Sequence, residues 1–296
     1  INSIISNSSD DFEIVIIHKD PSSFEKYKKN ILPNDNLQRL QILKFINNNY
    51  KFPEVENSHV SEATYFRLFL TNILSSEIEN LVYVDADVVC VSDPFPHLND
   101  EFKEFLQSKS LIGVKTTNVY SDDKDVTLFS RLGIKSSYFN AGVMFINFKK
   151  WVKSDLSFKL QKHLIEISDK IEYWDQDVLN SYFDGNYYEL DEKYNYLLDI
   201  NYEFTKSNIQ DIEKNIFFHY VGSVKPWTLE GIFRNTSIYY HKYFRKANIE
   251  KYHIVSSWKK NDIKFFLKLI KTRKIMNTDM PLSLIVSFFR MLISKY

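Results

Sequence analysis

Short apolar stretches that alternate with helical patterns restrict the fold of this chain more than any other feature. Phe12–Ile17, Leu81–Val84 and Gly142–Ile146 are four to six residues long and almost wholly apolar, which is typical of buried strands. Apolar residues recur at helical spacing in Ser61–Leu74 and Leu156–Ile167. Because strands covered by helices on both faces read as continuous apolar runs, the pattern predicts an α/β fold with a mainly parallel sheet flanked by helices.

Glycine is scarce, and its positions exclude two ways of holding a phosphate. The chain has six glycines among 296 residues, about 2% against roughly 7% in average proteins. No two of them have the spacing of the G-x-G-x-x-G dinucleotide fingerprint or of a Walker-type phosphate loop. If this protein holds a phosphate, it must use side chains or a metal.

The charges balance overall but are distributed unevenly. The chain has 38 basic and 38 acidic side chains, so total charge does not favour a nucleic-acid partner. Residues 245–296 nevertheless contain twelve Lys or Arg and only three acidic residues. This basic segment includes helical patterns at 261–275 and at Pro281–Ile293, and the latter is too short to span a bilayer. The segment suits either anionic lipid headgroups or docking on the acidic remainder of the chain.

The sequence shows neither a membrane span nor a secretory signal. No apolar run reaches the roughly 18 residues that a spanning helix needs, and no charged region followed by an apolar one stands at the N-terminus. Cys90 is the only cysteine, which excludes an internal disulfide and fits a reducing compartment. We expect a cytoplasmic protein, with peripheral contact to the inner face of the cytoplasmic membrane if the tail binds lipid.

The sharpest local signal is Asp85-Ala86-Asp87, directly after the apolar Leu81–Val84. Two carboxylates at i and i+2 can reach one hard divalent cation, and ligands bind beyond strand ends in open α/β sheets. An isolated D-x-D also arises by chance in acidic loops. His219 is the natural third ligand, since it follows an apolar run, although a lone histidine near a core is usually satisfied by hydrogen bonds alone.

Four further positions suggest contacts with a phosphate or a sugar, each with a simpler alternative. Lys225 offers a point charge for a phosphate. Arg67, inside an apolar helix, needs an anion, which an internal salt bridge would also provide. Asp175-Gln176-Asp177 opens a predicted helix, where acidic residues are favoured by the helix dipole in any case. Asn140 could bind a sugar hydroxyl or cap a turn.

In combination these motifs resemble glycosyltransferase family 8, and within it the bacterial lipopolysaccharide and lipooligosaccharide galactosyl- and glucosyltransferases. The resemblance rests on four segments in this order: Leu81–Asp87, Tyr138–Val143, Asp175–Asn180 and His219–Trp227. In addition, His59–Leu68 is similar to the family helix that carries a nucleotide-contacting arginine. The likeness runs from the start of the chain to about residue 245, and the tail resembles the family's membrane-associating end only in character.

The resemblance implies a GT-A fold at 1–244, a helical tail at 245–296, and retaining transfer of a hexose from a UDP-sugar to a glycan or glycolipid, with Mn²⁺ or Mg²⁺ bridging the diphosphate. It also implies three groups of site residues. The metal ligands would be Asp85, Asp87 and His219. The diphosphate or nucleoside would be held by Arg67, Gly222 and Lys225. The donor sugar would be surrounded by Asn140, Ala141, Asp175 and Gln176, with Gln176 on the face of the anomeric nucleophile or ion-pair stabiliser.

Two departures from the family pattern bear on activity. The family usually begins with a strand whose Asp and Tyr or Asn contact uracil and ribose, and this chain is expected to start after it. In Ile112–Thr117, Thr117 stands where the family has a sugar-binding aspartate, which leaves the donor hexose open. Two alternatives therefore remain: a non-catalytic sugar-nucleotide or glycan-binding protein of the same fold, and a self-glucosylating primer of the glycogenin kind.

Overall fold

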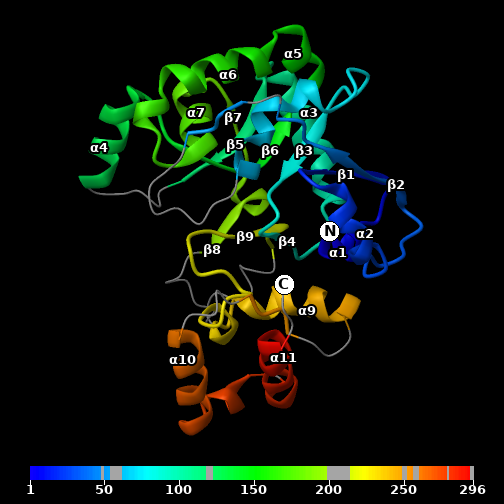
Figure 1. Cartoon of the computed structure of the whole chain (residues 1–296). Coiled ribbons are helices and arrows are strands. Elements are labelled where there is room, and N and C mark those ends of the chain that lie inside the picture. Colours follow the sequence, from blue (N-terminus) through cyan, green and yellow to red (C-terminus); the bar gives the residue numbers. More distant parts are fainter. Residues whose placement is uncertain are drawn as a thin grey trace.

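The computed structural model shows an elongated assembly of three small sheets and their helices (Figure 1). Its described residues are 1–47, 50–53, 62–117, 123–198, 214–248, 252–255, 260–278 and 280–293.

A four-stranded sheet forms the centre of the fold, in the order β3 (Leu81–Val84), β6 (Phe139–Ile146), β5 (Ile112–Thr116) and β7 (Tyr188–Glu189). β6 is antiparallel to both of its neighbours, whereas β5 and β7 are parallel. All residues of β6 are buried, as expected for a wholly apolar central strand. A register shift between β5 and β6 marks a bulge beside Gly142, close to the carboxyl end of β3.

A three-stranded sheet lies next to the central one, in the order β4 (Val88–Cys90), β9 (Phe217–Tyr220) and β8 (Tyr196–Leu198). β4 is antiparallel to β9, and β8 is parallel to it. The chain passes from β3 to β4 through the turn at Asp85–Asp87, where the Asp85 amide donates to Gly142 O at 2.8 Å. The acidic tripeptide therefore joins two sheets.

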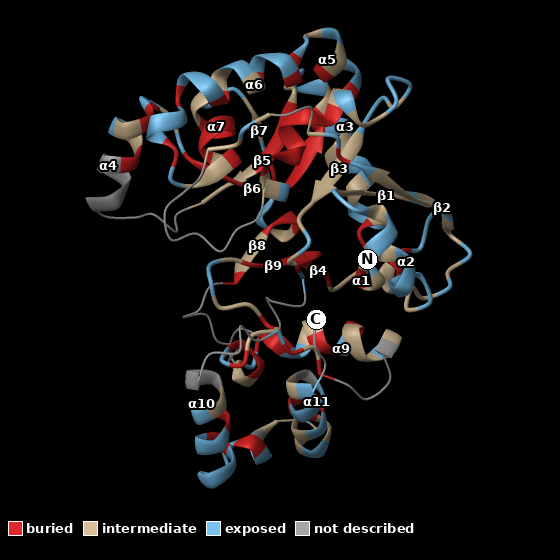
Figure 2. Cartoon of the chain, viewed as in Figure 1, coloured by how far each residue is buried: buried red, intermediate tan, exposed pale blue. Residues whose placement is uncertain are grey.

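Helices cover both faces of the central sheet, and Figure 2 shows buried residues concentrated in its inner strands β6 and β5. On one face the helices η1 (Glu62–Asn72), α6 (Leu156–Glu166) and α7 (Trp174–Phe183) pack together and share an apolar cluster with Met144 of β6. On the other face α3 (Phe95–Gln107) packs through Phe105 against Val143 and Phe145 of β6. The prediction of an α/β fold with helices on both faces is confirmed.

The remaining elements lie around this centre. A parallel pair, β1 (Phe12–His18) and β2 (Leu37–Lys44), forms the third sheet. The other helices are α1 (Asn2–Asn7), α2 (Pro21–Lys28), α4 (Asp123–Leu132), α5 (Phe148–Lys153), η2 (Ser168–Lys170), η3 (Glu192–Tyr194), η4 (Gly231–Phe233), α9 (Ser237–Asn248), α10 (Lys260–Lys271), η5 (Lys274–Asn277) and α11 (Pro281–Ile293).

The C-terminal helices have an apolar cluster of their own. Phe266 of α10 stacks on Phe288 of α11, with ring centroids 3.6 Å apart, and η4 contributes Ile232 to the same cluster. A helical tail is thus present, while its predicted boundary at residue 245 stays a prediction. In the part of the chain that the structure describes, every helix is too short or too polar to cross a bilayer.

Three local expectations need correction. More strands pair antiparallel than predicted. A central strand is buried on both faces whether its neighbours run parallel or antiparallel to it, so an apolar run in the sequence does not indicate strand direction. η1 is a 3₁₀ helix with non-helical backbone at Phe69, and Ser61, the first residue of the predicted helix, lies outside the described residues. Asn140 lies within β6 rather than ahead of the strand.

Candidate active site

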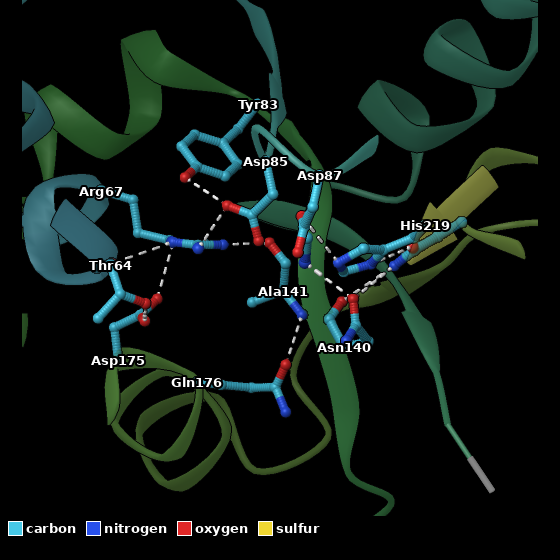
Figure 3. A network of polar contacts seen from close by, with 12 residues as sticks. Thr64, Arg67, Tyr83, Asp85, Asp87, Asn140, Ala141, Asp175, Gln176 and His219 are labelled. Atoms are coloured by element: carbon cyan, nitrogen blue, oxygen red, sulfur yellow. Dashed lines mark hydrogen bonds and ion pairs between the residues drawn. The ribbon is translucent and has the colours of Figure 1, made fainter. Parts of the chain in front are cut away.

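Asp85, Asp87 and His219 converge at the junction of the two sheets (Figure 3). Each offers one ligand atom, and these atoms all lie within 4.8 Å of one another. The sheet register explains the convergence, because β4 begins at Val88, directly after Asp87, and Val88 pairs with His219 of β9. His219 lies more than 130 positions after the two aspartates in the sequence, yet the three predicted metal ligands form one cluster with the donor atoms that a divalent cation needs.

Gly142 makes room for the imidazole of His219. A Cβ atom at this position would lie 2.1 Å from His219 Cε1, which is shorter than any allowed contact. His219 is 4% exposed, and its Nε2 lies 3.3 Å from Asp87 Oδ1. The missing side chain at Gly142 thus lets the ring lie against β6 and point toward the acidic turn.

Lys225 pairs with the second oxygen of Asp87, with Nζ 2.6 Å from Oδ2. Burial opposes the charged form of Asp87, but the hydrogen bond and charge of His219 and the charge of Lys225 outweigh it and lower the pKa of Asp87. Gly222 lies between β9 and Lys225 with φ at +80°, in the left-handed region that favours glycine. Gly222 therefore shapes the turn that presents Lys225 to the acidic cluster.

Arg67 connects Asp85 to the helix α7. Its Nη2 lies 2.7 Å from Asp85 Oδ1 and its Nε 2.7 Å from Asp175 Oδ2, while Nη1 donates to the carbonyl of Ala141. The guanidinium also lies over the ring of Tyr83, 4.3 Å from the centroid. Burial alone would lower the pKa of Arg67, but Asp175 and Asp85 raise it, so this buried group stays charged. The internal salt bridge that the sequence left open is present, and it is a double one.

Asp175 lies in the first turn of α7 and is 2% exposed. Besides pairing with Arg67, it accepts a hydrogen bond from the hydroxyl of Thr64. Burial raises the pKa of Asp175 to about 6, against the opposing effects of Arg67 and Thr64. This carboxylate is enclosed by protein groups, which suits it to holding its neighbours in place rather than to attacking a substrate.

Gln176 lies beside β6, on the same side of the site as Asp175 (Figure 3). Its Oε1 accepts a hydrogen bond of 3.1 Å from the amide of Ala141. One turn further along α7, Asn180 bonds to both the amide and the carbonyl of Phe139. These amide contacts fix α7 against β6, so Gln176 has a defined place next to Asn140 and Ala141.

Asn140 uses its side chain within the protein. Its Oδ1 accepts from the amide of Gly142 at 2.9 Å and from Asn195 Nδ2 at 2.9 Å. The structure therefore shows the local backbone contact that the sequence offered as the simpler alternative. Thr117, the departure from the family pattern, donates its backbone amide to Tyr138 O at the end of β5.

Sequence reasoning missed several residues that build the site. Tyr83 donates its hydroxyl to Asp85 Oδ1 at 2.7 Å, but it stands inside a run that reads as an apolar strand. Asn195 contacts His219 from a stretch without any recognisable motif. Asp177, by contrast, was part of a motif, yet it turns away from the cluster and bonds to Arg131 and Tyr138.

Comparison with known proteins places this chain among glycosyltransferases. Residues 1–231 match glycosyl transferase family 8. The chain is 30% identical over 168 residues to a lipopolysaccharide 1,3-galactosyltransferase of Salmonella typhimurium, and 30% identical over 185 residues to a lipopolysaccharide 1,2-glucosyltransferase of Escherichia coli K12. These matches cover 56% and 60% of this chain and 49% and 53% of the relatives, so the chain spans about half the length of the curated relatives it matches.

Solved structures support the same fold. The galactosyltransferase LgtC, crystallised with donor and acceptor sugar analogues, superposes with a TM-score of 0.61 at 19% identity, covering 88% of this chain and 92% of LgtC. The bifunctional glycosyltransferase WbbM superposes with a TM-score of 0.60 at 21% identity, covering 89% of this chain and 48% of WbbM. With a GT-A fold of this kind and a sequence match over most of its length, the chain belongs to glycosyl transferase family 8.

Proposed function

We propose that this chain catalyses the retaining transfer of a hexose, galactose or glucose, from a UDP-sugar to lipopolysaccharide or another surface glycan, with a bound divalent cation. The observation that carries the proposal is the convergence of Asp85, Asp87 and His219 within 4.8 Å beside the Lys225 cation. The names of the curated relatives support the choice of hexose and of acceptor.

The donor set fits Mn²⁺ or Mg²⁺. Carboxylate oxygens suit both ions, and an imidazole nitrogen is a better ligand for Mn²⁺ than for Mg²⁺. Since the pKa of Asp87 is lowered, its carboxylate is in the ionised form that a cation requires. Asp85, Asp87 and His219 would hold the ion. When bound, the ion would supply positive charge that offsets the negative charge on the departing UDP.

Lys225 and Arg67 have different roles in the compensation of negative charge at the site. Lys225 is only partly buried, with about a quarter of its side chain exposed (23%), so it can turn from Asp87 to a diphosphate at the mouth of the site. Arg67 is 4% exposed and held by two carboxylates, which limits it to orienting Asp85 and Asp175. We therefore assign Lys225 to stabilising the charge on the leaving group and Arg67 to fixing the site rather than to contacting the nucleoside.

The surroundings of Gln176 support a retaining path. Asp175 is enclosed by Arg67 and Thr64, whereas the neighbouring Gln176 is only half-buried and its Oε1 is held by the amide of Ala141. An amide oxygen is a weak nucleophile, which favours attack by the acceptor on the face that the leaving group vacates rather than a lasting covalent intermediate. In this assignment Gln176 stabilises the developing positive charge, and Asn140 and Ala141 contact the donor sugar.

The C-terminal helices suit a peripheral position on the cytoplasmic membrane. Leu282 and Ile293 of α11 are 79% and 80% exposed. Lys264, Lys268 and Lys271 are exposed on α10. Exposed apolar side chains close to lysines are typical of surfaces that bind anionic lipids. This position would place the enzyme next to a lipid-linked acceptor.

The proposal is tested by measuring UDP release from UDP-galactose and UDP-glucose in the presence of Mn²⁺. Release should disappear on chelation, and Asp87→Ala should reduce it by more than the about 10- to 100-fold that is typical of losing a hydrogen-bond partner of a metal ligand. Release that survives both treatments contradicts the metal role. Binding of UDP without any release from either donor would support the alternative of a non-catalytic sugar-nucleotide-binding protein.

A further inference from the structure

A chain of buried hydrogen bonds runs from the backbone of β6 to the imidazole of His219. Gly142 donates its amide to Asn140 Oδ1 at 2.9 Å, and Asn195 Nδ2 reaches the same oxygen at 2.9 Å. The other end of the Asn195 amide, Oδ1, lies 3.0 Å from His219 Nδ1. Asn140, Asn195 and His219 are 8%, 1% and 4% exposed. Figure 3 shows Asn140 and His219 adjoining below the acidic turn.

The direction of each bond in this chain follows from its first member. A backbone amide can only donate, so the Asn140 atom that faces Gly142 is the carbonyl oxygen. That oxygen can only accept, so the Asn195 atom that faces it is the amide nitrogen. The opposite end of the Asn195 side chain is then its oxygen, which requires a proton on His219 Nδ1.

The protonation of Nδ1 leaves the lone pair of a neutral imidazole on Nε2, the nitrogen that faces the acidic turn. Nε2 lies 3.3 Å from Asp87 Oδ1. Without a metal, a second ring proton between these two atoms forms the hydrogen bond that lowers the pKa of Asp87, and a divalent cation would take the place of that proton. In the other tautomer Nε2 would donate to Asp87, and His219 would be lost as a ligand.

We propose that Asn195 is a positioning residue that holds His219 in the tautomer and orientation in which Nε2 binds a divalent cation. The inference rests on the proposed metal-dependent function and names a residue on which it depends. Hydrogen-bond partners of ligating histidines fix the ring in this way, and their loss typically weakens metal binding by about 10- to 100-fold. Through Nδ2 the same side chain also holds Asn140, so one residue supports both the metal ligand and a proposed sugar contact.

The test compares three variants in the full chain, each first shown to be folded by circular dichroism. Asn195→Leu keeps the volume and removes both hydrogen bonds. Asn195→Asp keeps an acceptor for His219 Nδ1 and removes the donor to Asn140. Asn147→Leu is the matched control, since Asn147 is 9% exposed and caps α5 through Lys150 N, remote from the cluster.

Two readouts are used: the dissociation constant for Mn²⁺ alone, from the electron paramagnetic resonance of the free ion, and the tautomer of His219, from the ¹⁵N resonances of labelled histidine with and without Mg²⁺. We expect Asn195→Leu to weaken Mn²⁺ binding about 10- to 100-fold and to lose the pure Nδ1–H form. Asn195→Asp should bind Mn²⁺ as well as the wild type or more tightly. Asn147→Leu should change neither readout.

The outcomes separate this inference from the proposed function. Unchanged Mn²⁺ binding and an unchanged tautomer in Asn195→Leu would overturn the inference while leaving the proposed function intact. Equal losses in Asn195→Leu and Asn147→Leu would also overturn it, because they would reflect general destabilisation. If Asn195→Leu does not fold, a loss of Mn²⁺ binding in Asn195→Asp overturns the inference. A wild-type protein that binds no Mn²⁺ overturns the proposed function, and the tautomer of the cation-free protein still tests the role of Asn195.

Discussion

Gly231 lies directly against the backbone of Lys225. A Cβ atom on Gly231 would be 1.9 Å from the carbonyl oxygen of Lys225, closer than atoms can approach. The same carbonyl accepts from the amide of Thr228 at 2.9 Å and from its hydroxyl at 2.8 Å. The position of the proposed leaving-group cation is therefore set by a tight turn of backbone contacts, in which one glycine is indispensable.

Gly231→Ala should displace this turn and with it the ammonium group of Lys225. A misplacement of about 1 Å can cost up to about 100-fold in rate, so we expect kcat/KM for the UDP-sugar to fall by 10- to 100-fold with smaller effects on stability. The measurement is steady-state UDP release. As a control, Gly133→Ala adds a Cβ where nothing lies within 4 Å; the φ of +70° at Gly133 makes this change cost stability, but it should leave kcat/KM of the folded protein unchanged.

Gly142→Ala should abolish binding of Mn²⁺, because the new methyl group would occupy the space of the His219 ring. Isothermal titration calorimetry is the measurement, with Gly113→Ala as the control in the same sheet. At Gly113 a Cβ meets only side chains, at 3.2 Å and beyond. Retention of full Mn²⁺ affinity in Gly142→Ala would show that His219 is not a ligand.

Arg67→Met should destabilise the fold strongly. The substitution leaves Asp85 and Asp175 without the cation that neutralises them, and removing one partner of a buried ion pair typically costs about 3–5 kcal/mol. Urea denaturation should show the loss at neutral pH. The exposed pair of Lys149 and Glu79 offers the contrast, since solvent screens it and Lys149→Met should leave the stability nearly unchanged.

Asp175 should make the stability of the protein depend on pH. Its pKa is raised from 3.8 to about 6 by burial, so the folded state binds this proton more tightly than the unfolded state does. The resulting stabilisation is complete below about pH 4 and is lost as the pH rises to about 6, by about 3 kcal/mol in total. Denaturation midpoints of Asp175→Asn should lack this component. An identical pH dependence in the variant and the wild type would contradict the shift.

Charge reversal on α10 tests the proposed membrane contact. Lys264, Lys268 and Lys271 are exposed, and each lysine near an anionic bilayer contributes about 1 kcal/mol to binding. The triple change to Glu should therefore abolish co-sedimentation with phosphatidylglycerol-containing vesicles without affecting UDP release in solution. A pair of reversals on α6, at the exposed Lys159 and Lys162, serves as the control. Unchanged sedimentation of the α10 variant would favour docking of the helices on the protein itself.

Much of the fold and of the candidate site could be predicted from the sequence because the relevant signals are local. The run Leu81–Val84 marks a strand end, so the acidic tripeptide could be placed there. His219 could be suggested as the third ligand from the apolar run before it, and the resemblance supported that choice, but nothing in the periodicity shows that β9 pairs with β4. The roles of Tyr83 and Asn195 could not be predicted from the sequence, because their hydrogen bonds form only once distant strands have paired.

The turn at Asp85–Asp87 connects two sheets that are packed together by apolar side chains, so its geometry depends on how these sheets pack. Val143 of the central sheet and Phe217 of its neighbour belong to one such cluster. A slight sliding of either sheet would change the gap between the carboxylates and the imidazole. The geometry of the proposed metal site therefore depends on core packing. A substitution that removes a methyl group from that apolar cluster should change the affinity of the site for a divalent cation.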